Sequence, residues 1–237
     1  MQIIKLVLFD MDGVLVNSTP EVETFWTEWA NKYGVEMNRH VLDTKVHGQT
    51  MYRTVDVVFG HLEEKERNKI IAEGIVFDMD MQPPLIKGVA AFIQKLKQND
   101  ITIGLVTSSM YERAEKILNH LNIFSHFDFR VSAKDIKRGK PDPEPYLLMS
   151  DIAQVPAADC LVFEDSNSGI RSALSAGMNV VAVQERWNEE QQEKFPVQAV
   201  IKDFAEISID EEKQLFVQKE GKKQQSLFQL KTITDAQ

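Results

Sequence analysis

Residues 8–16 read Leu-Phe-Asp-Met-Asp-Gly-Val-Leu-Val, and the apolar run that leads into them ends at Asp10 and Asp12. A short, β-branched apolar run that stops at a turn residue, here Gly13, is typical of a buried strand. In an open parallel sheet the ligand crevice lies at the carboxyl ends of the strands, so we expect Asp10 at that edge and Asp12 on the following loop. Two neighbouring carboxylates repel each other unless a cation lies between them. The pair therefore predicts a site for Mg²⁺ and a phosphate group.

The composition is that of an ordinary globular protein. The chain has 237 residues, 43% of them hydrophobic, and a formal net charge of −9. Binding to nucleic acid or to an anionic membrane needs a basic face, so neither is expected as a partner. The single cysteine, Cys160, excludes an intramolecular disulfide and a cysteine metal cluster. With no signal peptide or membrane-length apolar stretch recognised, the expected location is the cytoplasm, and the expected state is a monomer or weak homodimer.

Strand and helix patterns alternate through most of the chain, which favours an α/β fold with a doubly wound parallel sheet. We expect strands at 3–9, 101–106, 127–131, 160–163 and 179–183, and helices at 20–34, 50–59, 62–78, 88–98, 110–121, 143–153 and 167–176.

About 90 residues, nearly all helical or loop, separate the first two strands of this sheet, far more than a crossover needs. The sequence therefore predicts a helical cap, inserted at 17–82, in an α/β core made of 1–16 and 83–210. Two apolar runs flank a charged turn at 219–222, so the segment 211–237 is expected to be a hairpin or a loosely ordered tail.

Chemically suitable residues follow each of the main strands in turn. Thr107 and Ser108 follow the second strand, Lys140 lies in a loop before a helix, and Glu164 and Asp165 follow a later strand. A carboxylate can attack phosphorus, and a lysine and hydroxyl groups can hold the phosphate oxygens as charge develops. A hard cation such as Mg²⁺ prefers carboxylate oxygens. The set therefore indicates phosphoryl-group chemistry.

Four motifs in this order resemble the haloacid dehalogenase (HAD) superfamily, in the group that carries a helical cap, over roughly residues 4–185. The resemblance implies a HAD-like Rossmannoid core and a metal-dependent phosphatase with Mg²⁺ as its cofactor. It implies that Asp10 is the nucleophile that forms an aspartyl-phosphate and also a metal ligand. It further implies that Asp12 is the general acid and base, and that its carbonyl also binds the metal.

The other roles implied by the resemblance concern the phosphate and the metal. Thr107 and Ser108 bind the transferring phosphoryl group, and Lys140 neutralises charge on Asp10 and the phosphate. Asp165 is expected to bind Mg²⁺, and Glu164 to orient the metal or its water. Each residue has a bland alternative: Thr107, for example, is also a plausible helix cap.

Two activities fit the resemblance: hydrolysis of a small sugar or polyol phosphate, and a sugar phosphomutase reaction of the β-phosphoglucomutase type. The mutase pattern has a histidine where this chain has Val22, an arginine near Met51, and Ser-Lys-Asn where it has Ser109-Met110-Tyr111. The phosphatase reading is therefore preferred, with a small-molecule phosphate ester as the binding partner.

The cap should close over the site and select the leaving group. His47 and Gln49 are its candidate substrate-binding residues, although a histidine at this place is equally typical of a structural role. A haloalkanoate dehalogenase needs no metal, so Asp12, Glu164 and Asp165 argue against it. A phospho-acceptor receiver has its acceptor on a later strand, so the order of motifs argues against that class too.

Overall fold

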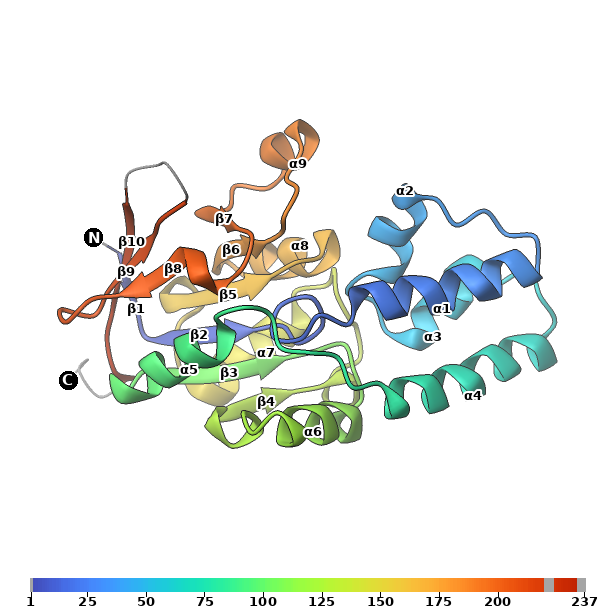
Figure 1. The fold of residues 1–237 in the computed structure, drawn as a ribbon, viewed down its shortest axis with the longest axis horizontal. Helices are drawn as coiled ribbons and strands as arrows, with labels where there is room; N and C mark the ends of the chain where they lie inside the picture. Colours follow the sequence, from blue (N-terminus) through green and yellow to red (C-terminus); the bar gives the residue numbers. More distant parts are fainter. Residues whose placement is uncertain (1, 220–223, 234–237) are drawn as a thin grey trace.

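The computed structural model describes residues 2–219 and 224–233. Three parts follow one another along the long axis of the molecule, with a helical cap at one end, a central α/β layer structure and a small sheet at the other end (Figure 1). The cap and the small sheet therefore lie at opposite ends of the molecule, with the central sheet between them.

The central sheet has six parallel strands in the order β4-β3-β2-β5-β6-β7. β2, which comes first in the chain among these six strands, lies in the interior of the sheet. Its neighbours, β3 and β5, come from later parts of the chain. This order reverses at β2, which places a crevice at its carboxyl end. The strands are β2 (Leu6–Phe9), β3 (Thr102–Val106), β4 (Phe129–Val131), β5 (Cys160–Glu164), β6 (Asn179–Val183) and β7 (Ala199–Ile201).

Both faces of this sheet are covered, as the apolar strand sequences require. Along β2, Val7 and Phe9 join one hydrophobic cluster, whereas Leu6 and Leu8 join the other. α5 and α6 pack on the first face, and α7 and α8 on the second. The expected doubly wound α/β fold is confirmed. The helices of the core are α5 (Val89–Gln98), α6 (Tyr111–His120), α7 (Glu144–Ala153), α8 (Asn167–Ser175), α9 (Glu189–Lys194), and the short turns η2 (Phe124–His126), η3 (Ala133–Asp135), η4 (Ala157–Asp159) and η5 (Phe204–Glu206).

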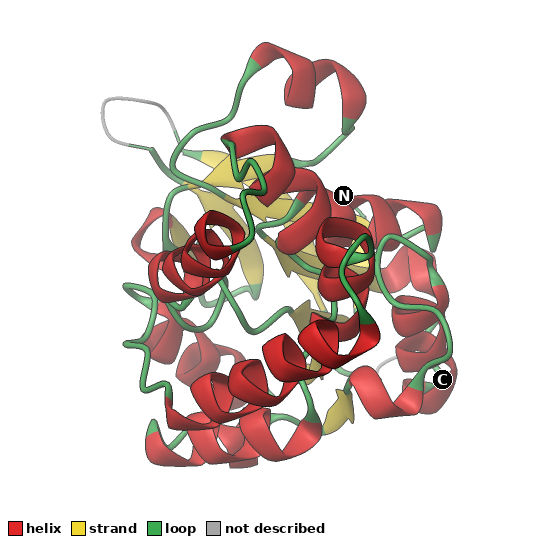
Figure 2. Ribbon diagram, turned by 90° about the vertical axis from the view of Figure 1, so that its right-hand side faces the viewer, coloured by secondary structure: helices red, strands yellow, loops and turns green. Residues whose placement is uncertain are grey.

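The inserted segment between β2 and β3 is helical and has its own apolar core. Trp26 and Trp29 of the first cap helix pack with Phe59 and Ile70 of later ones. In the view from the cap end, these helices lie in front of the strands (Figure 2). The helical insertion is therefore confirmed, whereas the boundaries at 17 and 82 stay predictions. Its helices are α1 (Thr19–Lys32), α2 (Arg39–Val41), the π-helical η1 (Leu42–Val46), α3 (Met51–Phe59) and α4 (Glu64–Asp80).

The strand expected at 3–9 is wrong as a single element, because Lys5 divides it. Residues Ile3–Ile4 form β1, which pairs with β10 in a second sheet, and only Leu6–Phe9 form β2. The Lys5 side chain turns out to Asp159, at 3.0 Å. The second sheet has the order β1-β10-β9-β8 and contains β8 (Ile207–Ile209), β9 (Gln214–Val217) and β10 (Gln225–Leu230).

The two runs expected to make a C-terminal hairpin form β9 and β10, which pair antiparallel. Most of the charged turn expected at 219–222, and the last residues of the segment 211–237, lie outside the described residues. Among the described helices, none combines the length and the apolar character that a membrane crossing requires.

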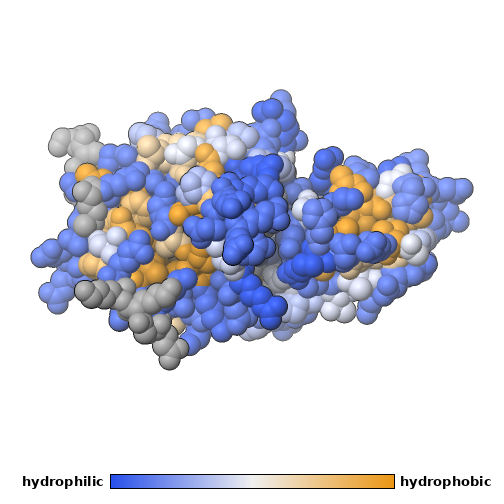
Figure 3. All heavy atoms as spheres, turned by 90° about the horizontal axis from the view of Figure 1, so that it is seen from above, coloured by the Kyte–Doolittle hydropathy of each residue, from blue (hydrophilic) through white to orange (hydrophobic). Residues whose placement is uncertain are grey.

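One loop of the cap contacts the core through its main chain. Ser108 donates a hydrogen bond to the carbonyl of Gly48 (2.8 Å), and Ser168 donates one to the carbonyl of His47 (2.9 Å). Gly48 has a φ of 70°, and a Cβ there would lie 2.3 Å from the Ser166 hydroxyl, so only glycine permits this approach. Between the core and the cap the surface is indented, and hydrophilic residues border the indentation (Figure 3).

Candidate functional site

The residues expected from the sequence meet at the carboxyl edge of the central sheet. Asp10 directly follows β2, and its backbone N–H donates to the carbonyl of Phe163 in β5 (3.1 Å). Thr107 directly follows β3, Glu164 is the last residue of β5, and Asp165 comes next. Parallel pairing in register on both sides of β2 brings Asp10 next to residues that lie far from it in the sequence.

Lys140 lies at the centre of this group and is almost fully buried. Its ammonium donates to Asp10 Oδ1 (2.7 Å), Glu164 Oε1 (2.6 Å) and the carbonyl of Val106 (3.1 Å). Three acceptors satisfy its three N–H bonds. Burial alone would lower the pKa of Lys140, but Asp10 and Glu164 raise it well above its ordinary value. Lys140 is therefore a fixed positive charge beside Asp10.

Asp10, Glu164 and Asp165 form a group that could hold a metal ion, because one oxygen of each lies within 4.8 Å of the others. Burial is the largest cause that raises the pKa of Asp10, to about 7, and the pKa of Asp165 well above its ordinary range. The nearby carboxylates add to both shifts, and Lys140 only partly opposes them. Three acidic groups with one ammonium are short of positive charge, so the residues present fit a hard divalent cation.

Glu164 is fully buried, and Lys140, Tyr146 and Ser166 donate hydrogen bonds to its carboxylate. Its Oε1 also accepts from the Tyr146 hydroxyl (3.2 Å), and its Oε2 accepts from the N–H (3.0 Å) and hydroxyl (3.1 Å) of Ser166. These contacts fix the carboxylate that in turn holds Lys140. The geometry therefore gives Glu164 a direct contact with Lys140, which the sequence did not predict, beside its expected place near the metal.

The carboxylate of Asp12 points to a different set of partners. Arg113 of α6 binds it with two hydrogen bonds, Nη1 to Oδ2 (2.7 Å) and Nη2 to Oδ1 (2.8 Å), and Ser18 and Ser109 also donate to it. Burial by itself would raise the pKa of Asp12, but Arg113 and the two hydroxyls lower it below its ordinary value. In this arrangement Asp12 is an anion.

This bidentate pair bears on two expectations for Asp12. Its side chain is not in the acidic group that could hold a metal, so a contact with the ion would have to come from its carbonyl, which stays a prediction. A general acid must carry a proton, so Asp12 would have to leave Arg113 before it could protonate a leaving group.

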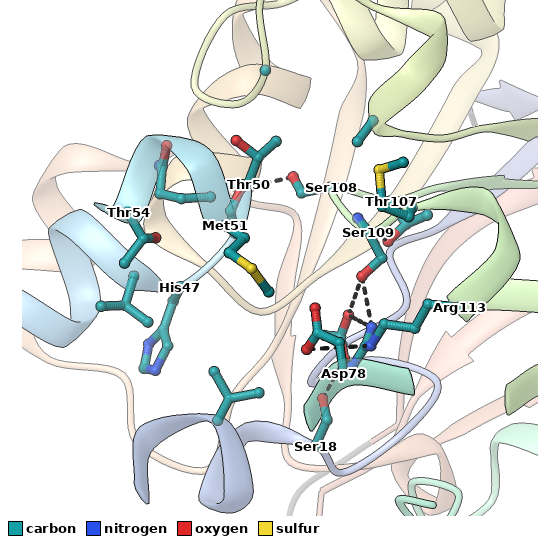
Figure 4. Close-up of a pocket in the computed structure, with 18 of the residues that line it drawn as sticks. Ser18, His47, Thr50, Met51, Thr54, Asp78, Thr107, Ser108, Ser109 and Arg113 are labelled. Atoms are coloured by element: carbon teal, nitrogen blue, oxygen red, sulfur yellow. Dashed lines mark hydrogen bonds and ion pairs between the residues drawn. The ribbon is translucent and has the colours of Figure 1, made fainter. Parts of the chain in front are cut away.

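A cavity of about 510 Å³ lies over this edge of the sheet, between core and cap. Figure 4 shows Thr107, Ser108 and Ser109 on its core side, and His47, Met51 and Thr54 on its cap side. Thr107 is buried, and its hydroxyl accepts from the N–H of Ser109 (3.0 Å). The cavity is lined by seven of the expected site residues: Asp10, Asp12, His47, Gln49, Thr107, Ser108 and Asp165.

Contacts with core and cap already engage two of the expected substrate-binding side chains. The Ser108 hydroxyl donates its hydrogen bond to the Gly48 carbonyl. His47 lies 3.0 Å from Glu23 and 3.4 Å from Asp43, and burial lowers its pKa despite these carboxylates. Binding of substrate by His47, Gln49 or Ser108 stays a prediction.

Sequence reasoning missed Arg113 and Asp78. Arg113 is buried at the start of α6, and its Nε lies 3.6 Å from Asp78 of α4, so it joins the acidic loop of the core to the cap. An arginine next to the buried positions Ala114, Ile117 and Leu118 of α6 was the available signal, because an unpaired arginine there would be costly.

Fold and site together define a hydrolase with a phosphate-ester site built on a Rossmann-like sheet. The family model described as haloacid dehalogenase-like hydrolase matches residues 7–183, so the chain belongs to that family. The resemblance seen in the sequence is confirmed, and the protein is an enzyme of the phosphatase branch of these hydrolases.

Relatives with assigned activities are similar over most of the chain. Validoxylamine A 7'-phosphate phosphatase of Streptomyces hygroscopicus subsp. limoneus is 29% identical over 86% of this chain and 95% of its own. Hexitol phosphatase A of Escherichia coli is 31% identical over 74% of this chain and 81% of its own. The crystal structure of β-phosphoglucomutase from Clostridium difficile superposes with a TM-score of 0.70 at 26% identity, covering 85% of this chain and 92% of that one.

Proposed function

We propose that the protein is a Mg²⁺-dependent phosphatase that hydrolyses a small sugar or polyol phosphate through an aspartyl-phosphate on Asp10. One observation carries the proposal: Asp10 faces Lys140 at 2.7 Å inside an acidic group suited to a divalent ion. Two anions, a carboxylate and a phosphate, can approach only where positive charge surrounds them. Mg²⁺ bound by Asp10 and Asp165 would supply the rest of that charge.

In the first step an oxygen of Asp10 attacks phosphorus, and the bond from phosphorus to the leaving oxygen breaks. Asp12, once it has left Arg113 and taken up a proton from water, gives that proton to the leaving oxygen. In the second step water attacks the aspartyl-phosphate, gives a proton to Asp12, and releases inorganic phosphate and free Asp10. Lys140 neutralises charge on Asp10 and the phosphate throughout, and Thr107 holds the phosphoryl oxygens.

The phosphatase relatives support hydrolysis, since hexitol phosphatase A is 31% identical and its name gives a polyol phosphate as substrate. A phosphomutase of the β-phosphoglucomutase type is the second candidate, because a β-phosphoglucomutase shares the fold at 26% identity. Val22, Met51 and Met110, which replace polar or basic residues of the mutase pattern, all line the cavity. These replacements favour transfer to water.

The test is phosphate release from a panel of sugar and polyol phosphates, with Mg²⁺ and with EDTA. We expect release that EDTA stops, and that Asp10→Asn lowers by about a thousandfold or more without changing the circular dichroism spectrum. Glucose 1-phosphate with a bisphosphate primer tests the mutase in the same panel. Turnover retained in Asp10→Asn, or unaffected by EDTA, would overturn the proposal.

A further inference from the structure

The outer part of the cavity, which receives the leaving group, is bounded by charged residues of mainly one sign. Among the described residues that line the cavity, five are acidic and two are basic. Asp10 and Asp165 lie at the phosphate end, where Lys140 compensates charge and a metal ion would add to it, and Asp12 is paired with Arg113. Asp78 and Glu112 lie beyond them, on the cap side and on α6.

The two basic residues are poorly placed to receive a second anion. Arg113 is buried, and it already donates both terminal nitrogens to Asp12 while Asp78 lies 3.6 Å from its Nε. One guanidinium between two carboxylates leaves a net negative charge. Lys137 is exposed at the rim, where water and salt screen its charge.

Asp78 stands at the passage from the phosphate end to the cap. Arg113 donates to Asp12 through its terminal nitrogens, and Asp78 lies 3.6 Å from its Nε, so one guanidinium contacts both carboxylates. Figure 4 shows Asp78 next to Arg113. About a third of the Asp78 side chain is exposed, and burial raises its pKa to about 6, so at pH 7.5 it is largely ionised. A negatively charged leaving group would pass close to this carboxylate.

Beside polar cap residues such as His47, Thr50 and Thr54, the cavity also has apolar side chains in its lining. Phe25 and Phe77 stack with ring centroids 4.6 Å apart, and Met51 points into the cavity (Figure 4). Ile75 and Met110 also line it, and both are nearly half exposed. Apolar side chains exposed at a binding site are suited to contact with apolar ligand surface.

We propose that this pocket selects phosphate monoesters whose leaving group is uncharged and offers an apolar or C–H face, and that Asp78 is a specificity-determining residue that disfavours a second anionic group. The inference rests on the proposed phosphatase function and narrows its substrates. A bisphosphate is then a poor ligand, which separates this site from any enzyme that must hold two phosphates at once.

The test compares phenyl phosphate with 4-carboxyphenyl phosphate, because the two esters differ by one negative charge far from phosphorus. The carboxylate makes the phenol no poorer a leaving group, so a lower rate reports binding in the pocket. We expect kcat/KM to be on the order of tenfold higher for phenyl phosphate, mainly through KM, and the ratio to fall at high salt.

Asp78→Asn should narrow this ratio by about threefold or more, whereas Asp80→Asn should leave it as in the wild type. Asp80 is the matched control, since it is an exposed aspartate on the same helix and does not line the cavity. A hexose monophosphate and the bisphosphate of the same hexose give a second pair with the same expected order.

Equal rates for the two esters, or faster turnover of the charged one, would overturn the inference while leaving the phosphatase function intact. An unchanged ratio in Asp78→Asn would overturn the role of Asp78. If neither these esters nor any sugar or polyol phosphate were hydrolysed with Mg²⁺, the proposed function itself would fail, and this inference with it.

Discussion

Asp10 is a buried carboxylate whose negative charge Lys140 compensates only in part. Burial and the neighbouring Glu164 raise its pKa to about 7 against an ordinary value of 3.8, even though Lys140 opposes the shift. Between these two pH values the folded protein without metal holds a proton that the unfolded chain has released. Its stability therefore falls as the pH rises through this range, and a bound cation would restore it.

At the residue scale we therefore predict that Mg²⁺ binding depends on pH. At a pH below the Asp10 pKa of about 7, the ion must displace a proton from Asp10. The dissociation constant for Mg²⁺ should therefore be about tenfold larger at pH 6 than at pH 8. At a fixed Mg²⁺ concentration the thermal stabilisation should be correspondingly larger at pH 8. Isothermal titration calorimetry and thermal unfolding at both pH values measure these effects.

Asp10→Asn provides the control for this prediction, because it removes one titrating carboxyl and keeps the shape of the side chain. Its Mg²⁺ affinity should be weaker and should change less between the two pH values. Equal affinity of the wild type at pH 6 and pH 8 would show that no carboxyl titrates on binding.

Single residues differ in how far the sequence reveals them. Asp10, Lys140, Glu164 and Asp165 could be expected at one place because each follows a strand or lies in a loop at the same edge of a parallel sheet. Arg113 and Asp78 could not, since their pairing depends on the angle at which α4 of the cap meets α6 of the core. Nothing in the local pattern of either helix fixes that angle.

At the scale of single elements, the first turn of α8 is shaped around Glu164. Ser166 is the N-cap of this helix, and its hydroxyl accepts from the N–H of Gly169 (3.0 Å). A Cβ on Gly169 would lie 1.6 Å from Glu164 Oε1. Because Lys140, Tyr146 and Ser166 hold that carboxylate, it cannot move away without breaking their hydrogen bonds.

We therefore predict that Gly169→Ala impairs catalysis although alanine is the better helix former by about 1 kcal/mol. Displacement of Glu164 should disturb Lys140 and lower kcat by about a hundredfold. Ser175→Ala, at an exposed position of the same helix, is the matched control and should keep full activity. Steady-state kinetics and chemical denaturation of both variants provide the comparison, and a fully active Gly169→Ala would refute the steric argument.

Elements were predictable where local pattern and sheet burial agree. The strands at 102–106, 160–164 and 179–183 are apolar runs between helices, and the structure has them within a residue of the expected bounds. The run 3–9 is equally apolar, but Lys5 allows its two halves to join different sheets. The sheet that each half joins depends on strands far along the chain, so the sequence of residues 3–9 alone does not predict the division.

For the molecule as a whole, the small sheet closes one side of the main hydrophobic core. Leu215, Val217, Phe228 and Leu230 are buried in the same cluster as Phe9 and Phe92. β9 and β10 lie at the end of the molecule opposite the cap (Figure 1), and none of their described residues lines the cavity. This sheet should therefore contribute to stability and not to substrate binding.

We predict that Phe228→Ala lowers the free energy of unfolding by about 3–5 kcal/mol, because it leaves a cavity in the core. At a temperature where the variant is folded, its KM should equal that of the wild type. Gln225→Ala, at an exposed position of the same strand, should change stability by less than about 0.5 kcal/mol. Urea unfolding measures the stability of each variant, and kinetics at about 15–20 °C measure its KM. A changed KM in Phe228→Ala would contradict a purely stabilising role of the small sheet.

The sequence predicted part of the overall organisation, namely the helical insertion but not the second sheet. The long helical interval between the first two strands predicted an insertion, since a parallel crossover does not need so many residues. The second sheet was not foreseen, because two of its strands, β1 and β8, are only two and three residues long. Such short strands form through their neighbours and leave little periodic signal.

The parallel pairing of Ile3 with Gln229 and Ile4 with Leu230 bears on biosynthesis. A ribosome releases residues 3 and 4 more than two hundred residues before the strand that they pair with, and domains otherwise begin to fold from the amino-terminal side during translation. A nascent chain halted before residue 225 would therefore leave β1 and β9 with open edges, and unpaired edges are the places where chains aggregate. The second sheet therefore closes only after residues 225–230 have left the ribosome.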